Sequence, residues 1–229
     1  SALLVAQEMP GIHVTEELKP VSMKAFSDRL YVYAFPKNMA GLCRLKVKGE
    51  AGTHITLKHG ELLKKDGRLE QGNINVYYHP VKPGEVFQMD EYYLKGTGEE
   101  ETFVPSFTYH GFQYVEVESD KPIQLTEESL TALFVHTDLK PVGSFSCSNE
   151  TLNKIWNATM QAYQSNLHSI PTDCPQREKN GWTADAHIAI DLGLLGFDGI
   201  TFYEKWMDDI IDNQRAEGDI SGIIPSSGW

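Results

Sequence analysis

The sequence predicts an antiparallel β-sandwich followed by a helical region, and three observations support this prediction. Short runs of alternating apolar and polar residues recur across residues 20–140 of the 229-residue chain. Turn-forming glycines separate these runs, as in "KKDGRL" and "KGTGEE". At Ser148 the apolar period changes from two residues to about 3.6, which is the change expected where strands give way to helices.

The strands are predicted from this alternation. In "LCRLKVKG", Cys43, Leu45 and Val47 fall on one face of an extended chain, and the basic residues fall on the other. The stretches "THITLKHG" and "FQYVEVES" alternate in the same way, and "TALFVHTD" is a short apolar run. Many short strands with glycine-rich turns favour a β-sandwich or a barrel. We assign residues 20–144 to the sandwich and residues 1–19 to a linker.

Three helices are predicted in residues 145–229. The first begins near Ser148, a suitable N-cap, and ends before Pro171. The second is expected over about 183–195 and the third over about 199–215. We assign this region to the opening part of a helical domain.

The second and third predicted helices are apolar around much of their circumference. Such a helix is buried among other helices, and three helices cannot surround one another completely. We therefore expect the chain to be a fragment, or its helices to pack against the sandwich, the missing part of the domain or another chain. The residues concerned are Ile188, Ile190, Leu192, Leu194, Leu195, Ile200, Phe202, Tyr203, Trp206, Met207, Ile210 and Ile211.

The overall negative charge limits the kinds of molecule that this protein can bind. The net charge is −12 and the pI is about 5.1, so an acidic surface repels phosphate backbones and argues against nucleic acid as a partner. No stretch reaches the roughly 18 apolar residues that a membrane-spanning helix needs, so no membrane insertion is expected. The start of the chain has no signal-peptide pattern, which leaves a periplasmic, extracellular or cytoplasmic location open.

Cysteine and histidine spacing predicts neither a disulfide framework nor a metal site. Cys43, Cys147 and Cys174 are far apart and are interpreted as small buried hydrophobic residues. The eight histidines are scattered, and His59 and His110 are interpreted as structural or surface residues. We expect no metal and no cofactor.

The stretch "TDCPQREKNGWTADAH", residues 172–187, is the candidate site. If it is helical, the spacing of Glu178, Trp182 and Asp185 places all three side chains on one side. Asp173 and Arg177 lie upstream of Gly181, where an irregular loop can bring them to the same place. Carboxylates beside an indole and a guanidinium suit a sugar, whose apolar face stacks on a ring while its hydroxyls bond to charged groups.

The chemistry that this cluster suggests is glycoside hydrolysis. Gathered carboxylates favour keeping one of them protonated, and such a group can give its proton to a leaving oxygen. Plainer readings stay open from spacing alone. Glu178 is equally consistent with a solvated surface turn, and Asp173 and Asp185 are equally consistent with turn or helix-terminal positions. Trp182 is equally consistent with an aromatic residue of the core.

The motif resembles the signature of the bacterial α-L-rhamnosidases of glycoside hydrolase family 78. The resemblance rests on "DCPQREKNGWTADAH" and extends to "NMAGLCRLKVKGEAGTHITLKHGELLKKDGRL", "FTYHGFQYVEVE" and "FSCSNETLNKIWNAT". It implies a β-sandwich followed by an (α/α)6-barrel catalytic domain of twelve helices, of which this chain holds the opening ones. The motif departs from the family pattern at Ala184, where glycine is common.

The resemblance also implies roles for the motif residues. Glu178 would be the general acid, Asp173 and Asp185 would hold rhamnose hydroxyls, Trp182 would pack on the sugar, and Arg177 would orient the carboxylates. The family inverts the anomeric centre, which requires a second carboxylate as base. That base is a later glutamate of the barrel, so this chain by itself is expected to be inactive.

Three functions follow as hypotheses. The first is an inverting α-L-rhamnosidase that releases terminal α-L-rhamnose from a rhamnose-containing oligosaccharide or glycoside. The second is a non-catalytic carbohydrate-binding β-sandwich, and the third is an accessory domain that docks to the rest of a barrel.

Overall fold

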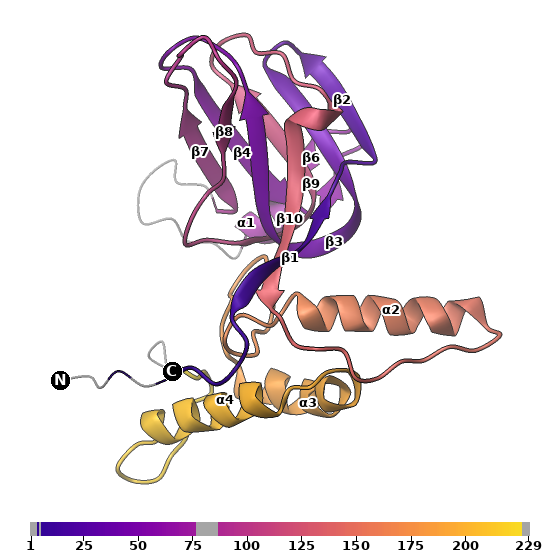
Figure 1. Cartoon of the computed structure of the whole chain (residues 1–229), viewed down its shortest axis with the longest axis vertical. Helices are drawn as coiled ribbons and strands as arrows, with labels where there is room; N and C mark the ends of the chain where they lie inside the picture. The colour runs from indigo at the N-terminus through magenta and orange to yellow at the C-terminus, as the bar shows by residue number, and fades with distance from the viewer. Residues whose placement is uncertain (1–3, 5, 77–86, 226–229) are drawn as a thin grey trace. The chain divides into compact units, whose positions relative to one another are not determined.

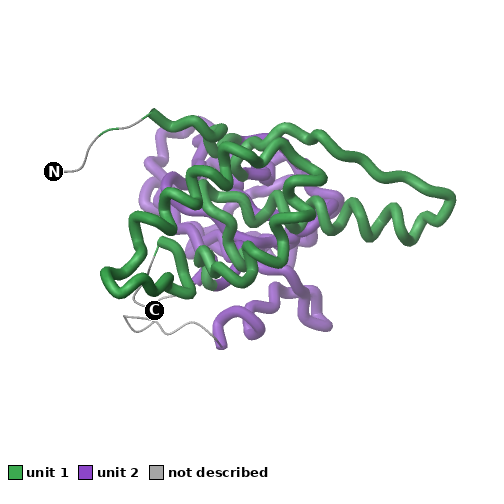
Figure 2. Tube along the Cα trace, turned by 90° about the horizontal axis from the view of Figure 1, so that it is seen from below, with its two compact units in different colours: residues 1–13, 136–174, 178–229 green, residues 14–135, 175–177 purple. Residues whose placement is uncertain are grey.

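The structure is a computed structural model, and it describes residue 4, residues 6–76 and residues 87–225. The chain divides into two compact units (Figures 1 and 2). The β-rich unit contains residues 14–135 and 175–177, and the helical unit contains residues 1–13, 136–174 and 178–229. The predicted order of a β-sandwich followed by helices is confirmed.

The β-rich unit is built on an eight-stranded sheet in the order β1-β10-β3-β9-β4-β7, with β2 and β8 also paired to β3. A separate hairpin joins β5 to β6. The strands are β1 (Ile12–Leu18), β2 (Ser22–Ser27), β3 (Leu30–Val47), β4 (His54–Gly60), β5 (Leu62–Leu63), β6 (Leu69–Glu70), β7 (Met89–Tyr93), β8 (Glu101–Phe103), β9 (His110–Ser119) and β10 (Leu130–Thr137). Two short helices, α1 (Gly72–Asn75) and the 3-10 helix η1 (Glu127–Ser129), lie between strands.

Strand β3 organises the sheet because it is 18 residues long and has different neighbours along its length. Its first part pairs with β2 and β9, and its last part pairs with β10 and β8. Gly41 lies at the change, paired with His110 of β9 on one side and Phe134 of β10 on the other. The sheet therefore curls (Figure 1), and its buried apolar side chains form one core cluster.

The core of this unit comes from the apolar phase of the alternating runs. Strand β4 shows the pattern, since Ile55, Leu57 and His59 are buried and the residues between them are half exposed. Glu116 is buried on β9 and accepts hydrogen bonds from Arg68 (Nε 2.7 Å, Nη2 2.8 Å). Burial alone would raise the pKa of Glu116, but hydrogen bonds from Arg68 and a backbone amide outweigh it and hold the pKa below its usual value.

The helical unit contains α2 (Glu150–Gln164), α3 (Thr183–Gly196) and α4 (Ile200–Asn213). Helix α2 is capped by Asn149, whose side chain accepts hydrogen bonds from two backbone amides of the first turn, so the prediction of Ser148 as the cap was wrong by one residue. The helix also ends at Gln164, well before Pro171. Pro171 instead forms an isolated bridge with Leu167.

The three helices meet at a buried pair of tyrosines. The hydroxyls of Tyr163 on α2 and Tyr203 on α4 lie 2.6 Å apart. Gly193 of α3 packs against this pair so closely that an added Cβ would lie 1.9 Å from the Tyr163 hydroxyl. The ring of Phe197 stacks on Tyr163 at 5.6 Å between centroids. Glycine is therefore required on α3 for the helices to approach.

Each helix also carries an apolar side that the described residues leave exposed, so burial was correctly predicted for only part of each circumference. Phe202, Tyr203 and Trp206 are buried, as expected. The exposed apolar residues are Leu152, Ile155, Ile188, Leu194, Leu195, Ile200, Met207 and Ile211. Within the described residues, no helix has the length and apolar character needed to cross a membrane.

Three other expectations need correction. Residues 12–18 form strand β1, although we expected a linker over 1–19. The two units divide between residues 135 and 136, whereas we expected the change at 144–145. Cys147 is exposed and not buried, while Cys43 and Cys174 are buried as expected, and all three are free thiols.

Candidate active site

The candidate site is a loop that joins α2 to α3 and is closed at its base by two residues. The amide of Asp173 donates to the carbonyl of Asn180 (2.9 Å), and the amide of Asn180 donates to Oδ1 of Asp173 (2.9 Å). Residues 175–178 form the turn at the tip. Asp173 is thus held in place by the loop's own backbone.

Cys174 holds the inside of this loop. Its Sγ donates to Oδ2 of Asp173 (2.7 Å) and accepts from the amide of Glu178 (3.4 Å). Burial and the hydrogen bond to Asp173 raise the pKa of the Cys174 thiol, so it stays protonated and acts as a donor. The sequence interpretation of Cys174 as a small hydrophobic residue missed this role, because the contact depends on how the loop folds back.

Glu178 and Trp182 contact each other directly. Nε1 of Trp182 donates a 2.8 Å hydrogen bond to Oε2 of Glu178. The Glu178 side chain is exposed, and Trp182 is half-buried. The backbone of Trp182 forms a bridge with Ile223, and its ring lies beside Gly222. The indole is therefore fixed while the carboxyl group stays accessible.

The helical premise for this contact was wrong. Helix α3 begins at Thr183, so Glu178 and Trp182 precede it and only Asp185 lies in its first turn. The turn at 175–178 brings Glu178 back toward Trp182 instead. The two side chains are together as expected, but for a different structural reason.

Asp173 and Asp185 line one pocket of about 280 Å³ between α2 and α3. This volume is near the lower end of the range for small-molecule sites. Glu178 and Trp182 are not among the described residues that line it. The lining residues are Thr159, Ala162, Tyr163, Asn166, Leu167, Pro171, Thr172, Asp173, Asp185, Ala186, Ile188, Ala189 and Leu192.

Arg177 belongs to the other unit. Residues 175–177 group with the β-rich unit, where Gly111 packs so tightly against them that an added Cβ would lie 2.8 Å from Cβ of Gln176. The expected contact between Arg177 and the motif carboxylates therefore stays a prediction.

Gly181 supports the site from the other end of the loop. Its carbonyl accepts a 2.8 Å hydrogen bond from the amide of Ile224, and an added Cβ would lie 2.0 Å from the Ile224 carbonyl oxygen. A side chain at position 181 would push the 222–224 segment away from Trp182. The motif glycine is thus explained by close backbone approach.

Family models match both parts of the chain. The concanavalin-like domain of bacterial alpha-L-rhamnosidase matches residues 24–136. The bacterial alpha-L-rhamnosidase 6 hairpin glycosidase domain matches residues 140–229. The two matches follow the same order as the β-rich and helical parts.

Individual proteins named α-L-rhamnosidase are also similar. One from Formosa agariphila is 34% identical over 209 residues, which is 90% of this chain and 21% of that protein. One from Streptomyces avermitilis is 33% identical over 225 residues, 98% of this chain and 20% of that protein. The chain therefore spans about a fifth of the length of these curated relatives.

Solved structures of α-L-rhamnosidases are also similar to this chain. The α-L-rhamnosidase from Dictyoglumus thermophilum superposes with a TM-score of 0.86 at 38% identity, covering 96% of this chain and 24% of that one. The Streptomyces avermitilis α-L-rhamnosidase complexed with L-rhamnose also gives a TM-score of 0.86, at 32% identity, covering 98% of this chain and 21% of that one.

Proposed function

The chain belongs to the bacterial α-L-rhamnosidases of glycoside hydrolase family 78, and from this we propose that it supplies the general acid and part of the sugar-binding site of an inverting α-L-rhamnosidase. The substrate would be a terminal α-L-rhamnose on an oligosaccharide or other glycoside. Glu178 is the proposed acid, and the observation that carries this assignment is its hydrogen bond with Trp182.

The bond to Trp182 suits a proton donor. An indole N–H can only donate, so Oε2 of Glu178 must accept from it. In the acid form, the proton is then carried by Oε1. The exposed position of the carboxyl group lets a glycosidic oxygen approach that proton.

Asp173 and Asp185 are the proposed contacts to the sugar hydroxyls. Both line the same pocket, and ionised carboxylates accept strong hydrogen bonds from hydroxyl groups. Asp173 is fixed by Asn180 and Cys174, so it needs little reordering when the sugar binds. Trp182 offers the ring face on which the sugar would pack.

In the proposed reaction, Glu178 gives its proton to the glycosidic oxygen as the bond from that oxygen to the anomeric carbon breaks. A water molecule attacks the same carbon from the opposite face and gives its proton to a carboxylate base. The two carboxyl groups of an inverting enzyme are about 6.5–9.5 Å apart to leave room for that water. We nominate no residue of this chain as the base, and we propose that the chain alone does not turn over substrate.

The test is Glu178→Gln in the protein that carries this chain, assayed on two rhamnosides. Loss of a general acid costs about 10²–10⁴-fold in rate. The loss should be large for an alkyl rhamnoside, whose leaving oxygen needs a proton, and much smaller for a nitrophenyl rhamnoside, whose leaving group does not. Glu204→Gln, an exposed glutamate on α4, is the matched control and should leave both rates unchanged. An equal loss on both substrates would argue against Glu178 as the acid.

A further inference from the structure

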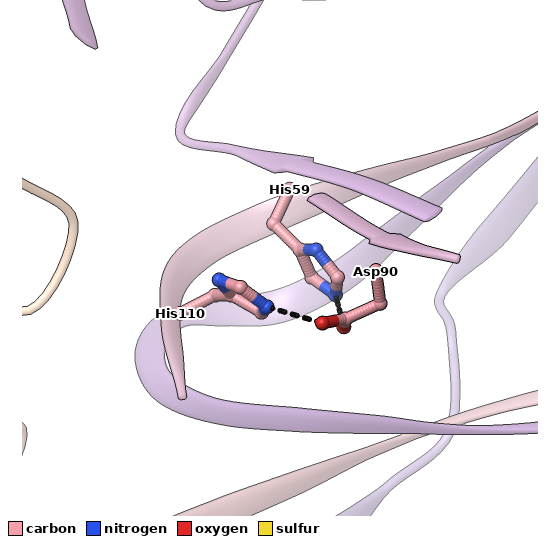
Figure 3. Close-up of side chains that lie close together, drawn as sticks. All are labelled: His59, Asp90 and His110. Carbon is pink, nitrogen blue, oxygen red and sulfur yellow. Dashed lines mark hydrogen bonds and ion pairs between the residues drawn. The ribbon is translucent and has the colours of Figure 1, made fainter. Parts of the chain in front are cut away.

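Two histidines and an aspartate that are far apart in the sequence come together inside the β-rich unit (Figure 3). His59 is the penultimate residue of β4, Asp90 lies on β7, and His110 begins β9. Nε2 of His110 lies 3.0 Å from Oδ1 of Asp90, and Nε2 of His59 lies 3.8 Å from Oδ2 of the same carboxyl group. One ligand atom from each residue lies within 4.8 Å of the other two.

The cluster is buried, which makes its charge important. His59, Asp90 and His110 are 0%, 8% and 4% exposed. Oδ2 of Asp90 has no hydrogen-bond partner among the residues that the structure describes. A buried carboxylate is costly unless positive charge or donors compensate it.

The surrounding shell orients His59 toward the carboxylate. Nδ1 of His59 donates to the carbonyl of Gln88 (3.4 Å), and the amide of His59 donates to the same carbonyl (2.9 Å). In the neutral ring, Nε2 then carries a lone pair and faces Asp90. Metal-binding histidines are typically held in this way, with the second ring nitrogen bonded to a backbone carbonyl.

Gln88 also positions His110. Its side-chain amide donates to the carbonyl of Gly111 (2.7 Å) and its side-chain oxygen accepts from the amide of Gly111 (2.9 Å). Gln88 therefore connects the two strands that carry Asp90 and His110. The rings of His59 and His110 stack at 4.2 Å between centroids, with both Nε2 atoms near the one carboxyl group.

We propose that His59, Asp90 and His110 bind a divalent transition metal of the zinc class, which ties β4, β7 and β9 together. Two imidazoles and one carboxylate suit such an ion, whereas calcium and magnesium prefer oxygen ligands. Bonds of about 2.0–2.1 Å at tetrahedral angles place ligand atoms about 3.3 Å apart. The distances of 3.0 Å and 3.8 Å lie on either side of that value. The fourth position is left for water.

The three residues of the cluster belong to the β-rich unit, and none of them is among the residues proposed for the rhamnoside chemistry. Its role is structural: a bound ion stabilises the folded state by binding it in preference to the unfolded chain. The metal is therefore expected to change thermal stability more than turnover.

The experiment measures zinc binding to the protein that carries this chain. Chelator-treated protein is dialysed against ZnCl₂, desalted and analysed for metal by mass spectrometry, and its Tm is measured with and without zinc. Saturating zinc should raise the Tm of the wild type by roughly 5–10 °C, the shift expected when free metal is about 100-fold above Kd. Calcium at the same concentration should give no such shift. Co²⁺ should give visible absorption bands that excess zinc abolishes.

Variants assign the metal to these residues. Asp90→Asn and His110→Gln should each bind about one equivalent less zinc than the wild type. His54→Gln is the matched control, because His54 lies on the same strand and also pairs with a β7 carboxylate, Glu91 (2.9 Å), but is only half-buried and is not part of the metal-ligand cluster found among the described residues. It should keep the full zinc content.

The proposal is wrong if zinc leaves the wild-type Tm unchanged, or if the two variants retain as much zinc as the wild type. The first result would identify the cluster as a hydrogen-bonded histidine–aspartate group that binds no metal. If Asp90→Asn does not fold, the wild-type zinc and cobalt measurements still decide the question.

Discussion

Nε1 of Trp182 and Oε2 of Glu178 lie 2.8 Å apart, although neither residue lies within a helix. Chain reversal at 175–178 places them together, and the bridge from Trp182 to Ile223 fixes the indole. The proposed acid therefore has one oxygen held by a rigid ring, so its orientation depends on that ring.

The first prediction removes this hydrogen bond. Trp182→Phe keeps an aromatic face but lacks the N–H donor, so the carboxyl group of Glu178 loses its fixed orientation. A hydrogen bond to a charged group contributes about 1.5–3 kcal/mol, which corresponds to a fall in kcat of roughly 10–100-fold. Steady-state kinetics on an alkyl rhamnoside measures this fall in kcat. Trp156→Phe on α2 is the control, and a wild-type kcat for Trp182→Phe would show that the bond is not used.

The second prediction concerns Cys174, which bonds to both Asp173 and the amide of Glu178. Cys174→Ala removes both contacts, so KM for a rhamnoside should rise about 5-fold, the equivalent of one ordinary hydrogen bond. Cys174→Ser retains a donor and an acceptor and should restore most of the affinity. Cys147→Ala, at the exposed cysteine, should change nothing. Equal KM values for the alanine and serine variants would contradict this role.

The third prediction is a pH dependence caused by His168. Burial, with a smaller effect from nearby His136, lowers the pKa of His168 to about 4. The folded state therefore favours the neutral ring, whereas the unfolded chain takes up a proton below a pKa of about 6.5. The stability from this group is fully present above about pH 6.5 and is lost as the pH falls toward 4, by roughly 3 kcal/mol.

Urea unfolding at several pH values between 7.5 and 4.5 measures that loss. His168→Gln cannot take up the proton, so its stability should fall less steeply over this range than that of the wild type. His187→Gln, at an exposed histidine of α3, should keep the wild-type slope. Parallel curves for His168→Gln and the wild type would rule out His168 as the source.

The fourth prediction tests the helix contact at Gly193. A Cβ at this position would lie 1.9 Å from the Tyr163 hydroxyl, so Gly193→Ala must separate α2 from α3. Overpacking of this kind costs about 1–3 kcal/mol, measured as a lower midpoint in urea. In Gly199→Ala the nearest atom to the added Cβ is 3.5 Å away, so the free energy of unfolding should fall by no more than about 1 kcal/mol. Equal effects at the two glycines would show that the helices have room at Gly193.

Much of the fold was predictable because its signals are local. Alternation around Ile55 and Leu57 identified β4, and a 3.6-residue period located α3 and α4 to within about two residues. The cap of α2 was placed at Ser148 and not Asn149, because adjacent serine and asparagine residues are equally good caps. Register and strand neighbours, such as the change of partners at Gly41, could not be predicted from the sequence because they depend on contacts between distant segments.

In the candidate site, too, the local features were predictable and the contacts made by the folded chain were not. The types of residue in "TDCPQREKNGWTADAH" indicated a sugar site, but the contacts did not follow from helical spacing. Cys174 was missed because its partners are decided by a turn. The grouping of His59 with Asp90 and His110 was missed because three strands bring them together, and no short motif contains them.

Strand β3 has a consequence for how the β-rich unit comes apart. Because one continuous strand pairs with β2 and β9 at its start and with β10 and β8 at its end, pulling it out would break hydrogen bonds on every side at once. These pairings on both edges of β3 must break together before its amides are exposed, so hydrogen exchange along β3 should proceed through global unfolding rather than local fraying.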